Sequence, residues 1–325
     1  MDLKKAVKLI KSSKNILVTT HTKPDGDACG CVAALTEVLR SLGKKTTPML
    51  LTELPAWYAF LFDKKPAVFN KDISIKQLAQ FDIIITLDVN CYAQMPEIAD
   101  FLKKNKTPVL AIDHHLTDNA VGDAELVDTS AAAAGLIVLD LIKYAKWRIT
   151  PKIARALFVA ISTDTGWFRF TNTDSRTLNS CAYLMQLGVS ADGIYHRLYQ
   201  NFSLQRFRLM TAMLDTLQLH FDGRYATQYI LRTDFKKTGS VYTDTENLIN
   251  ECQRIETIQA AALFVETDDG RIKCSLRSRD SIDVRKIAQK YDGGGHKMAA
   301  GLHLKGPLKA AMKTIAAEIK KQLKK

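Results

Sequence analysis

The segment Asn15-Ile-Leu-Val-Thr-Thr-His21-Thr-Lys-Pro-Asp25-Gly-Asp27 is a short apolar run followed at once by polar and acidic residues. The run 15–20 has the length and apolar content of a buried β-strand. A helical pattern follows from Ala28 to Leu42 and ends before Gly43, a residue typical of helix C-termini. The segment therefore predicts a strand, a loop carrying one histidine and two aspartates, and a helix.

The alternation of strands and helices continues through the first half of the chain. Further strand-like runs lie at 47–51, 81–87 and 108–112, and further helical patterns lie at 75–80, 98–104, 131–143 and 151–161. Nearly continuous apolar strands separated by helices indicate an α/β fold, with a parallel sheet and helices on both faces. In such sheets, ligands bind outside the carboxyl ends of the strands.

The last third of the chain has a different pattern. Its strand-like runs are 225–231, 261–266 and 271–276, with a turn signal at 267–270 and a helical run at 284–291. A helical stretch at 194–217 separates it from the first half. The sequence therefore predicts three parts, which are an α/β domain at 1–190, a helical linker at 191–215 and a smaller α/β domain at 216–325.

Composition excludes several classes of protein. The chain has 325 residues, of which 46% are hydrophobic, so a disordered main state is not expected. Its six cysteines are scattered without a C-x-x-C pair, which excludes a disulfide scaffold. The apolar runs are too short to span a bilayer, and the N-terminus lacks a signal-peptide hydrophobic region. We therefore expect a soluble, cytoplasmic protein with no membrane partner.

The charge of the chain permits an anionic partner without requiring one. Lys and Arg number 46 against 34 Asp and Glu, which gives a formal net charge of +12. Many of the lysines lie in the C-terminal tail, where the simpler interpretation is the solvated face of a helix. Ile315, Ile319 and Leu323 recur at helical spacing in that tail, so one side of the helix is expected to pack on the domain.

Aspartates and histidines follow the ends of several predicted strands and one helix. They are His21, Asp25, Asp27, Asp88, Asp113, His114, His115 and Asp164. The carboxyl ends of parallel strands meet at one edge, so these side chains are expected to converge. Each aspartate taken singly is more typical of a cap or a turn. The prediction of a shared site therefore depends on four separate segments of the chain bringing Asp and His residues to the same edge of the sheet.

Several ionised carboxylates in one crevice raise one another's pKa and destabilise the fold. Two divalent cations would neutralise the four carboxylates of Asp25, Asp27, Asp88 and Asp164. A mixed Asp and His set without cysteine suits a transition metal such as Mn²⁺. Two such ions about 3.5–4 Å apart activate a water and stabilise the oxygens of a phosphoryl displacement. The sequence has no G-x-S-x-G elbow and no P-loop, so these residues predict metal-assisted phosphoester hydrolysis.

A second candidate element lies near the C-terminus, at Gly293-Gly294-Gly295-His296. Consecutive glycines let backbone amides approach a phosphate in a nest, and His296 would donate to it. A flexible turn before a helix is the alternative. Arg277 and Arg279 end a strand-like run, two residues apart, and would bind a phosphate from one face. The alternative is an edge strand with solvated charges.

A weaker signal follows Asp164 directly, in Thr165-Gly-Trp167-Phe-Arg169-Phe170. An aromatic ring here would stack on a base, and Arg169 would meet a phosphate. Packing into the core is the alternative for at least one of Trp167 and Phe170.

These motifs together resemble those of the DHH phosphoesterases. The matching motifs of the first domain are His21-Thr-Lys-Pro-Asp25-Gly-Asp27, Asp88, Asp113-His114-His115 and Ser162-Thr-Asp164-Thr-Gly. The stretch Gly293-Gly-Gly-His296-x-x-Ala-Ala-Gly301 resembles the DHH-associated C-terminal domain, DHHA1. Length and motif order are similar to the bifunctional oligoribonuclease/pAp-phosphatase branch, the nanoRNases. The resemblance covers nearly the whole chain.

The resemblance implies two Mn²⁺ ions, with Mg²⁺ or Co²⁺ as substitutes. It implies one ion on His21, Asp25 and Asp88, and the other on Asp27, Asp88, His114 and Asp164. His115 would face the substrate phosphate or the leaving group, and Asp113 would orient a neighbouring side chain. The implied substrate-binding residues are Arg277, Gly294, Gly295 and His296, with Gly293, Arg279 and Arg169 as further candidates.

The implied activity is hydrolysis of very short oligoribonucleotides to 5′-mononucleotides by a metal-activated water, together with removal of the 3′-phosphate from pAp. A homodimer is consistent with the resemblance. A soluble phosphodiesterase for linear or cyclic dinucleotides, of the pGpG or c-di-AMP type, is the alternative within the fold. A non-catalytic RNA-binding protein is the alternative from another class, although a pure binder would not need every metal ligand.

Overall fold

The computed structural model describes the chain except for residues 1, 90, 105, 116–120, 280–281 and 324–325, and except for the side chain of His296. It divides into two compact units, Met1–Gln200 and Asn201–Lys325. The division falls inside the predicted linker, which consists of two separate helices. Helix α8 (Ala191–Tyr199) belongs to the first unit and helix α9 (Leu204–Leu214) to the second.

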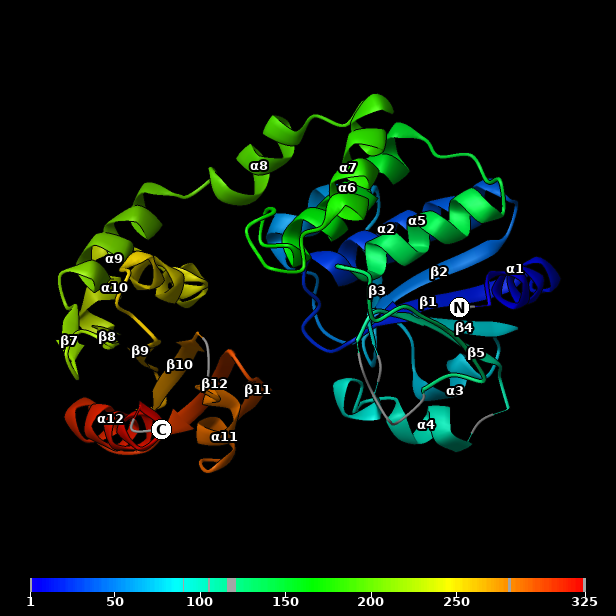
Figure 1. Cartoon of the computed structure of the whole chain (residues 1–325). Helices are drawn as coiled ribbons and strands as arrows, with labels where there is room; N and C mark the ends of the chain where they lie inside the picture. The colour runs from blue at the N-terminus through cyan, green and yellow to red at the C-terminus, as the bar shows by residue number, and fades with distance from the viewer. Residues whose placement is uncertain (1, 90, 105, 116–120, 280–281, 324–325) are drawn as a thin grey trace. The chain divides into compact units, whose positions relative to one another are not determined.

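The first unit is built on a six-stranded sheet in the order β3-β2-β1-β4-β5-β6 (Figure 1). Its strands are β1 (Asn15–Thr20), β2 (Lys45–Leu50), β3 (Ala67–Val68), β4 (Ile83–Leu87), β5 (Val109–Asp113) and β6 (Ala124–Val127). Every neighbouring pair is parallel, as predicted. All six carboxyl ends therefore lie at one edge of the sheet.

Helices cover both faces of this sheet, which explains the uninterrupted apolar strands. On one face lie α1 (Leu3–Ser12), α2 (Gly26–Ser41), α5 (Ala134–Tyr144) and α6 (Pro151–Asp164), and α7 (Ser175–Gln186) packs on α6. On the other face lie α3 (Ile75–Leu78) and α4 (Ala99–Lys104). Two short 3₁₀ helices, η1 (Ala56–Leu61) and η2 (Tyr92–Gln94), complete the unit. Alternate residues of β1 enter the two cores, Ile16 and Val18 on one side and Leu17 on the other.

The second unit is a six-stranded sheet in the order β11-β12-β10-β9-β8-β7. Its strands are β7 (Gln218–His220), β8 (Tyr225–Ile230), β9 (Ala260–Glu266), β10 (Ile272–Ser278), β11 (Gly294–His296) and β12 (Ala299–Leu304). Strands β8 and β9 are parallel and the other pairs are antiparallel. The sheet is mixed because the chain between β8 and β9 crosses over through helical segments.

Two layers cover this second sheet. Helices α11 (Val284–Gln289) and α12 (Leu308–Leu323) pack on one face, where Ile315 and Ile319 are buried as predicted. Helix α9 and the 3₁₀ helix η4 (Leu248–Arg254) pack on the other face, beside α10 (Arg232–Thr238) and η3 (Tyr242–Thr245). No helix among the described residues is both long and apolar enough to cross a bilayer.

The flexible turn that was the alternative at the triple glycine is wrong for residues 294–296, while phosphate binding by these glycines stays a prediction. Gly294 to His296 form strand β11, which pairs with Ala299 to Gly301 of β12. Residues 297–298 make the turn between these strands. The short strands β3, β6, β7 and β12 are likewise not predicted from the sequence. These strands are two to six residues long, and glycine and alanine give little β signal.

Helices α2 and α6 cross in close contact at Gly30. A Cβ atom on Gly30 would lie 2.5 Å from the carbonyl oxygen of Ala156 and 2.8 Å from the Cβ of Ala160. We expect Gly30→Ala to push the helices apart and to lower the free energy of unfolding by about 1–3 kcal/mol, as for other overpacked cores. Urea unfolding measures the change.

Gly193→Ala is the matched control, because Gly193 lies in helix α8 and a Cβ there would meet only the Ser190 side chain that caps that helix. Alanine is the better helix former, so this variant is expected to be as stable as the parent or slightly more stable. Equal stability of Gly30→Ala and the parent would contradict the close crossing.

Candidate active site

The predicted acidic and histidine residues do meet at the carboxyl edge of the parallel sheet. His21 follows β1, Asp88 follows β4, and Asp113 ends β5 with His114 and His115 behind it. Asp25 caps helix α2 and Asp27 lies in its first turn, while Asp164 is the last residue of α6. Gly26 lets the start of α2 touch the end of α6, because any side chain there would strike Thr163. This contact brings the α2 aspartates to Asp164.

One group of ligand atoms comprises His21, Asp25 and Asp88, all within 4.8 Å of one another. The Nε2 of His21 lies 3.5 Å from Oδ2 of Asp88. Its Nδ1 lies 2.9 Å from the carbonyl oxygen of Thr22, which can only accept a hydrogen bond. The Nδ1 of His21 therefore carries a proton, and Nε2 is the nitrogen that faces the carboxylates.

A second group comprises Asp27, His114 and Asp164. The Nε2 of His114 lies 3.4 Å from Asp164, 3.5 Å from Asp88 and 3.9 Å from Asp27. Its Nδ1 faces the carbonyl oxygen of Ala131 at 3.1 Å, so His114 is oriented in the same way as His21. Asp88 contacts both groups through its two carboxylate oxygens.

Asp113 and His115 form a pair beside these two groups. The Nδ1 of His115 lies 2.9 Å from Oδ1 of the fully buried Asp113 and 3.6 Å from Oδ1 of Asp88. The hydrogen bond to Asp113 raises the pKa of His115. Asp113 fixes the orientation of this imidazole, whose ring is the most exposed of the three, with 36% of its side chain accessible.

Burial and mutual repulsion disturb the ionisation of the carboxylates. Desolvation by the surrounding protein raises the pKa of the buried Asp27 and also that of Asp25, whose side chain is still accessible to solvent, and the charge of Asp88 raises both further. Burial likewise raises the pKa of Asp164 to about 7. Burial would also raise the pKa of Asp88, but the imidazoles of His114 and His21, whose Nε2 atoms lie 3.5 Å from its carboxylate, lower it to about 2.

The negative charges of the aspartates also raise the pKa of the histidines, which favours the protonated imidazoles. Burial would lower the pKa of His21, but Asp88 and Asp25 raise it to about 9. Burial would also lower the pKa of His114, and the surrounding aspartates raise it to about 10. The site therefore attracts positive charge strongly, and without another cation it holds protons on its histidines.

Unpaired buried atoms test whether this site fits divalent cations. Among the described side chains, Oδ1 of Asp88, Oδ2 of Asp113 and Nε2 of His114 are buried without a hydrogen-bond partner. Buried polar atoms seldom remain unpaired. A carboxylate oxygen and an imidazole nitrogen aimed at one space are the donors that divalent transition metals prefer. The residues present thus fit divalent metal ions, and Asp88 contacts both groups of side chains.

Asp27 has a second task, which the sequence does not reveal. Its Oδ2 accepts a hydrogen bond from the backbone N–H of Ala134 (2.6 Å), and its Oδ1 accepts one from Gly135 (2.9 Å) and one from the thiol of Cys31 (3.2 Å). These amides begin helix α5, whose own N-cap residue, Ala133, has no side chain to cap it. Asp27 therefore supplies the missing cap from another helix. The alanines that precede α5 show in the sequence that this helix lacks a cap of its own, but they do not identify Asp27 as its partner.

Backbone strain marks two places beside the ligands. Asp88 has a φ of 55°, a left-handed conformation that aspartate tolerates better than most residues. After Asp164, Gly166, Trp167 and Phe168 are all left-handed, and two of them are aromatic. Such strain persists only where the surroundings impose it, and it concentrates at functional sites.

Of the two aromatic side chains after Asp164 for which base stacking and core packing were the alternatives, Trp167 is packed and Phe170 is exposed. Trp167 packs on Tyr195 and Tyr199 of α8, with ring centroids 5.1 and 5.8 Å apart. Phe170 is 55% exposed. The Nε of Arg169 donates to the carbonyl oxygen of Gly166 at 2.8 Å, so this guanidinium closes its own turn.

In the second unit, the two predicted arginines share one face of the sheet. The Nε of Arg277 donates to the side chain of Asn250 at 3.2 Å, and Arg279 donates to the carbonyl oxygen of Gln253. Both partners belong to η4. Burial lowers the pKa of Arg277, and no acidic side chain of the described residues pairs with it. A half-buried guanidinium without an acid is suited to an anion.

Gly293, which precedes β11, and Gly294 and Gly295 within it are surrounded differently. A Cβ on Gly293 or Gly295 would strike the carbonyl oxygen of Gly301 or of Ala299 at 2.4 Å, so packing against β12 requires both. A Cβ on Gly294 would meet nothing within 4 Å. Gly294 is thus the one of the three that is open to a ligand. The side chain of His296, the fourth predicted residue here, lies outside the described part of the chain.

Known proteins match this arrangement over both units. Residues 15–161 match the DHH family, N-terminal domain, and residues 222–325 match the DHHA1 domain. The chain is 31% identical, over 90% of its length and 84% of the relative's, to the bifunctional oligoribonuclease and PAP phosphatase NrnA of Thermus thermophilus. The chain belongs to the DHH phosphoesterase family.

Two further comparisons agree with the DHH assignment. NrnA of Bacillus subtilis, named for the same two activities, is 27% identical over 91% of each chain. The crystal structure of an exopolyphosphatase-related protein from Bacteroides fragilis superposes with a TM-score of 0.92, at 23% identity, over 98% of this chain and 95% of that one. That structure supports the fold of the DHH and DHHA1 domains.

Substitutions of Asp27 are expected to separate its capping role from its charge. Asp27→Asn keeps a side-chain oxygen for the amides of α5, whereas Asp27→Ala leaves both amides without an acceptor. In chelator, we expect the alanine variant to be less stable than the asparagine variant by about 1–2 kcal/mol, the usual worth of a helix cap. Urea unfolding with EDTA present measures this difference, and equal stabilities would contradict the capping role.

The raised histidine pKa values predict that metal affinity increases with pH. Below about 9 for His21 and 10 for His114, the metal-free side chains are protonated, and a cation must displace those protons from Nε2. Mn²⁺ affinity should therefore rise from pH 6 to pH 8, by about tenfold per pH unit for each proton displaced. Calorimetric titration in buffers of different ionisation enthalpy measures both the affinity and the protons released. An Mn²⁺ affinity that does not change with pH would contradict the displacement of protons from His21 and His114 by the metal.

Proposed function

We propose that this DHH protein hydrolyses very short oligoribonucleotides to 5′-mononucleotides and converts pAp to AMP and phosphate. The observation that carries the proposal is the pair of ligand groups bridged by Asp88, at the carboxyl edge of the parallel sheet. Two relatives of similar length that are named for these activities support it. Membership of the DHH phosphoesterase family gives phosphoester hydrolysis as the class of reaction. The proposal concerns which substrates are hydrolysed.

Two divalent cations fit the proposed chemistry, and we take them to be Mn²⁺. His21, Asp25 and Asp88 would hold one, and Asp27, Asp88, His114 and Asp164 would hold the other. When bound, these ions would supply Lewis-acid activation of a water and neutralise charge on the phosphoryl group. The protein's part is to keep both Nε2 atoms aimed inward, through the carbonyl groups of Thr22 and Ala131.

His115 is the proposed general acid. Asp113 accepts the Nδ1 proton of His115 and so directs Nε2 outward from the pair. The raised pKa of His115 keeps a proton available at neutral pH. Donation of that proton to the departing oxygen would stabilise the leaving nucleoside or nucleotide. Asp113 is a positioning residue in this scheme, since it acts through the imidazole.

Substrate binding is proposed for residues of the second unit and for one of the first. Arg277 and Arg279 would bind phosphate groups, Gly294 and Gly295 would offer backbone close to them, and His296 would donate a hydrogen bond. Arg169, beside the strained turn, would contact substrate from the first unit. Gly293 is proposed only as a neighbour in the motif, because packing against β12 already explains it.

Turnover by the purified protein tests the proposal. With Mn²⁺, we expect a 5′-labelled short oligoribonucleotide to be shortened stepwise and pAp to release phosphate. Asp88→Ala should lower both rates by several orders of magnitude, because the bridging ligand of both groups is lost. Arg277→Ala should mainly raise KM, by about tenfold or more, the loss expected for a charge-assisted hydrogen bond. Chromatography of the labelled products and a phosphate assay give the rates.

Other substrates distinguish the competing functions in the same assay. Rapid turnover of pGpG or of a cyclic dinucleotide, with neither pAp nor longer RNA cleaved, would replace the proposal with a dinucleotide phosphodiesterase. RNA binding that persists in EDTA without turnover of any substrate would replace it with a binding protein. Loss of turnover in Asp88→Ala together with retained folding is the result that supports the proposed site.

A further inference from the structure

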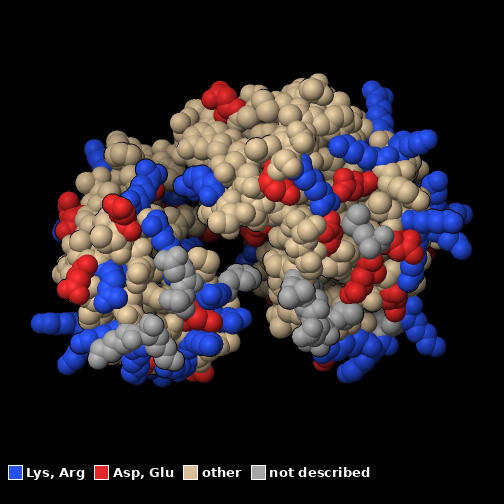
Figure 2. All heavy atoms as spheres, in the orientation of Figure 1, with Lys and Arg blue, Asp and Glu red and all other residues tan. Residues whose placement is uncertain are grey.

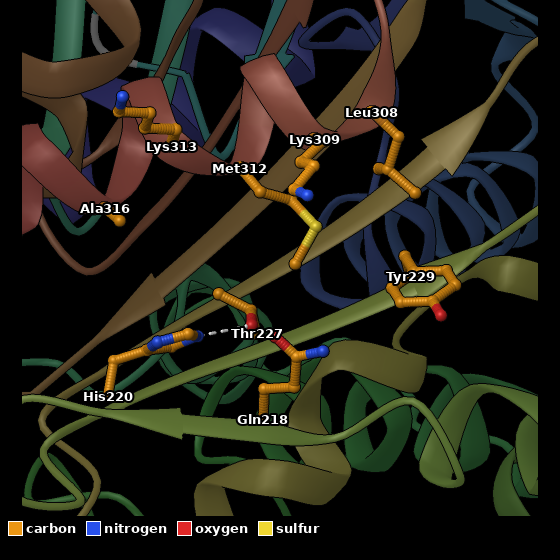
Figure 3. Close-up of a pocket in the computed structure, with 9 residues that line it drawn as sticks. All are labelled: Gln218, His220, Thr227, Tyr229, Leu308, Lys309, Met312, Lys313 and Ala316. Atoms are coloured by element: carbon orange, nitrogen blue, oxygen red, sulfur yellow. Dashed lines mark hydrogen bonds between the residues drawn. The ribbon is translucent and has the colours of Figure 1, made fainter.

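A cavity of about 370 Å³ lies in the second unit, between the strands β7 and β8 and helix α12 (Figure 3). Figure 3 shows Leu308, Lys309 and Met312 extending from the helix toward the strands, with Tyr229 opposite. Its full lining is Gln218, His220, Thr227, Tyr229, Leu308, Lys309, Met312, Lys313 and Ala316. The volume is within the range of small-ligand sites.

This cavity is separate from the substrate residues proposed above in the same unit. Arg277 contacts η4 on one face of the sheet, whereas its neighbours Cys274 and Leu276 point into the core under α12 on the other face. The cavity lies on the α12 side. It also lies at the β7 edge, while β11, which carries the glycines, is the strand at the opposite edge.

The lining has an apolar floor and a basic rim. Leu308, Met312 and Ala316 pack against the core below α12, and Tyr229 presents an aromatic ring among them. Lys309 and Lys313 are exposed at the helix side, and none of the nine described lining residues is acidic. Figure 2 shows several Lys and Arg side chains along the lower side of the second unit, where α12 lies in Figure 1, with single acidic residues among them.

The two rim lysines differ from the other lysines of the same helix. Lys321 pairs with Glu318 at 2.6 Å, and Lys320 lies over the ring of Phe221. Within the described part of the chain, neither Lys309 nor Lys313 pairs with a carboxylate. Two unpaired cations beside a cavity without acids attract an anion.

The polar groups on the strand side suit a heteroaromatic ring. The exposed amide of Gln218 offers two donors and an acceptor. His220 is held in place, since its Nε2 lies 2.8 Å from the hydroxyl of the buried Thr227. Tyr229 and the thioether of Met312 are partners on which a flat ring packs well.

We propose that this cavity is a second nucleotide site, which binds a nucleoside monophosphate. The base would lie on Tyr229 and Met312 with its edge at Gln218, and the phosphate would meet Lys309 and Lys313. Nucleoside monophosphates are also the products of the proposed activity, so the site would let product accumulate on the second unit. Binding there needs no metal ion, and its test is therefore independent of the proposed function.

Calorimetric titration of the full-length protein in EDTA tests the site with AMP, adenosine and inorganic phosphate as probes. We expect saturable binding of AMP, and binding of adenosine and of phosphate weaker by about fivefold or more. Lys309→Ala/Lys313→Ala should weaken AMP binding by about five- to tenfold, as two exposed charge pairs suggest. Tyr229→Leu, which keeps the apolar bulk, should weaken it by at least about fivefold through lost stacking.

Lys236→Ala/Lys305→Ala is the charge-matched control, since both lysines are exposed in the same unit outside the cavity lining. It should change AMP affinity by less than about twofold. Melting temperatures in EDTA verify that every variant is folded. Absence of AMP binding to the parent would overturn the proposal. AMP binding lost in Arg277→Ala but unchanged in both cavity variants would also overturn it, because the nucleotide would then occupy the other face.

Discussion

The repulsion among four aspartates at one edge of a sheet is the constraint on which the first unit depends. Asp27 and Asp88 are almost completely buried, and Asp25 and Asp164 lie beside them. Gathering carboxylates in a poorly solvated place costs free energy unless positive charge or hydrogen-bond donors compensate. The chain supplies part of that compensation itself, through two imidazoles and the amides of a helix N-terminus. Divalent cations would supply the rest of the positive charge that the aspartates require.

The surrounding fold holds these groups in place by packing rather than by ion pairs alone. Small residues let α2 and α6 approach until their ends bring the aspartates together, first at Gly30 and then at Gly26. Asp27 then fastens α5 to α2 through the uncapped amides of Ala134 and Gly135. The same carboxylate thus caps α5 and stands among the clustered acidic side chains. This capping explains why a charged group is tolerated among helices that are otherwise apolar.

The strands of the first unit and the Asp and His residues that follow them could be predicted because both are visible in short stretches of sequence. Apolar runs of five to seven residues followed by His21, Asp88 or Asp113 predict both the strand and the sheet edge at which the polar side chain lies. The partners of Asp27 could not be predicted, since backbone amides leave no trace in residue type. The left-handed Trp167 and Phe168 could not be predicted either, because side chains of that kind disfavour the conformation. For Gly293 and Gly295, composition indicated a turn, whereas the requirement is close packing on β12.

The second unit uses the period of two in its strands to separate two kinds of surface. On β10, Cys274 and Leu276 enter the core beneath α12, which leaves the alternate residue Arg277 on the η4 face. On β8, Tyr229 faces the α12 side and Ile230 enters the other core. Because α12 does not cover the β7 edge completely, an aromatic ring and unpaired lysines remain available there. One sheet therefore presents basic side chains on both faces, with Arg277 on the η4 face and Lys309 and Lys313 beside the cavity on the α12 face. Composition alone explains the many lysines near the C-terminus as a solvated helix face. The structure places two of them, Lys309 and Lys313, beside the cavity.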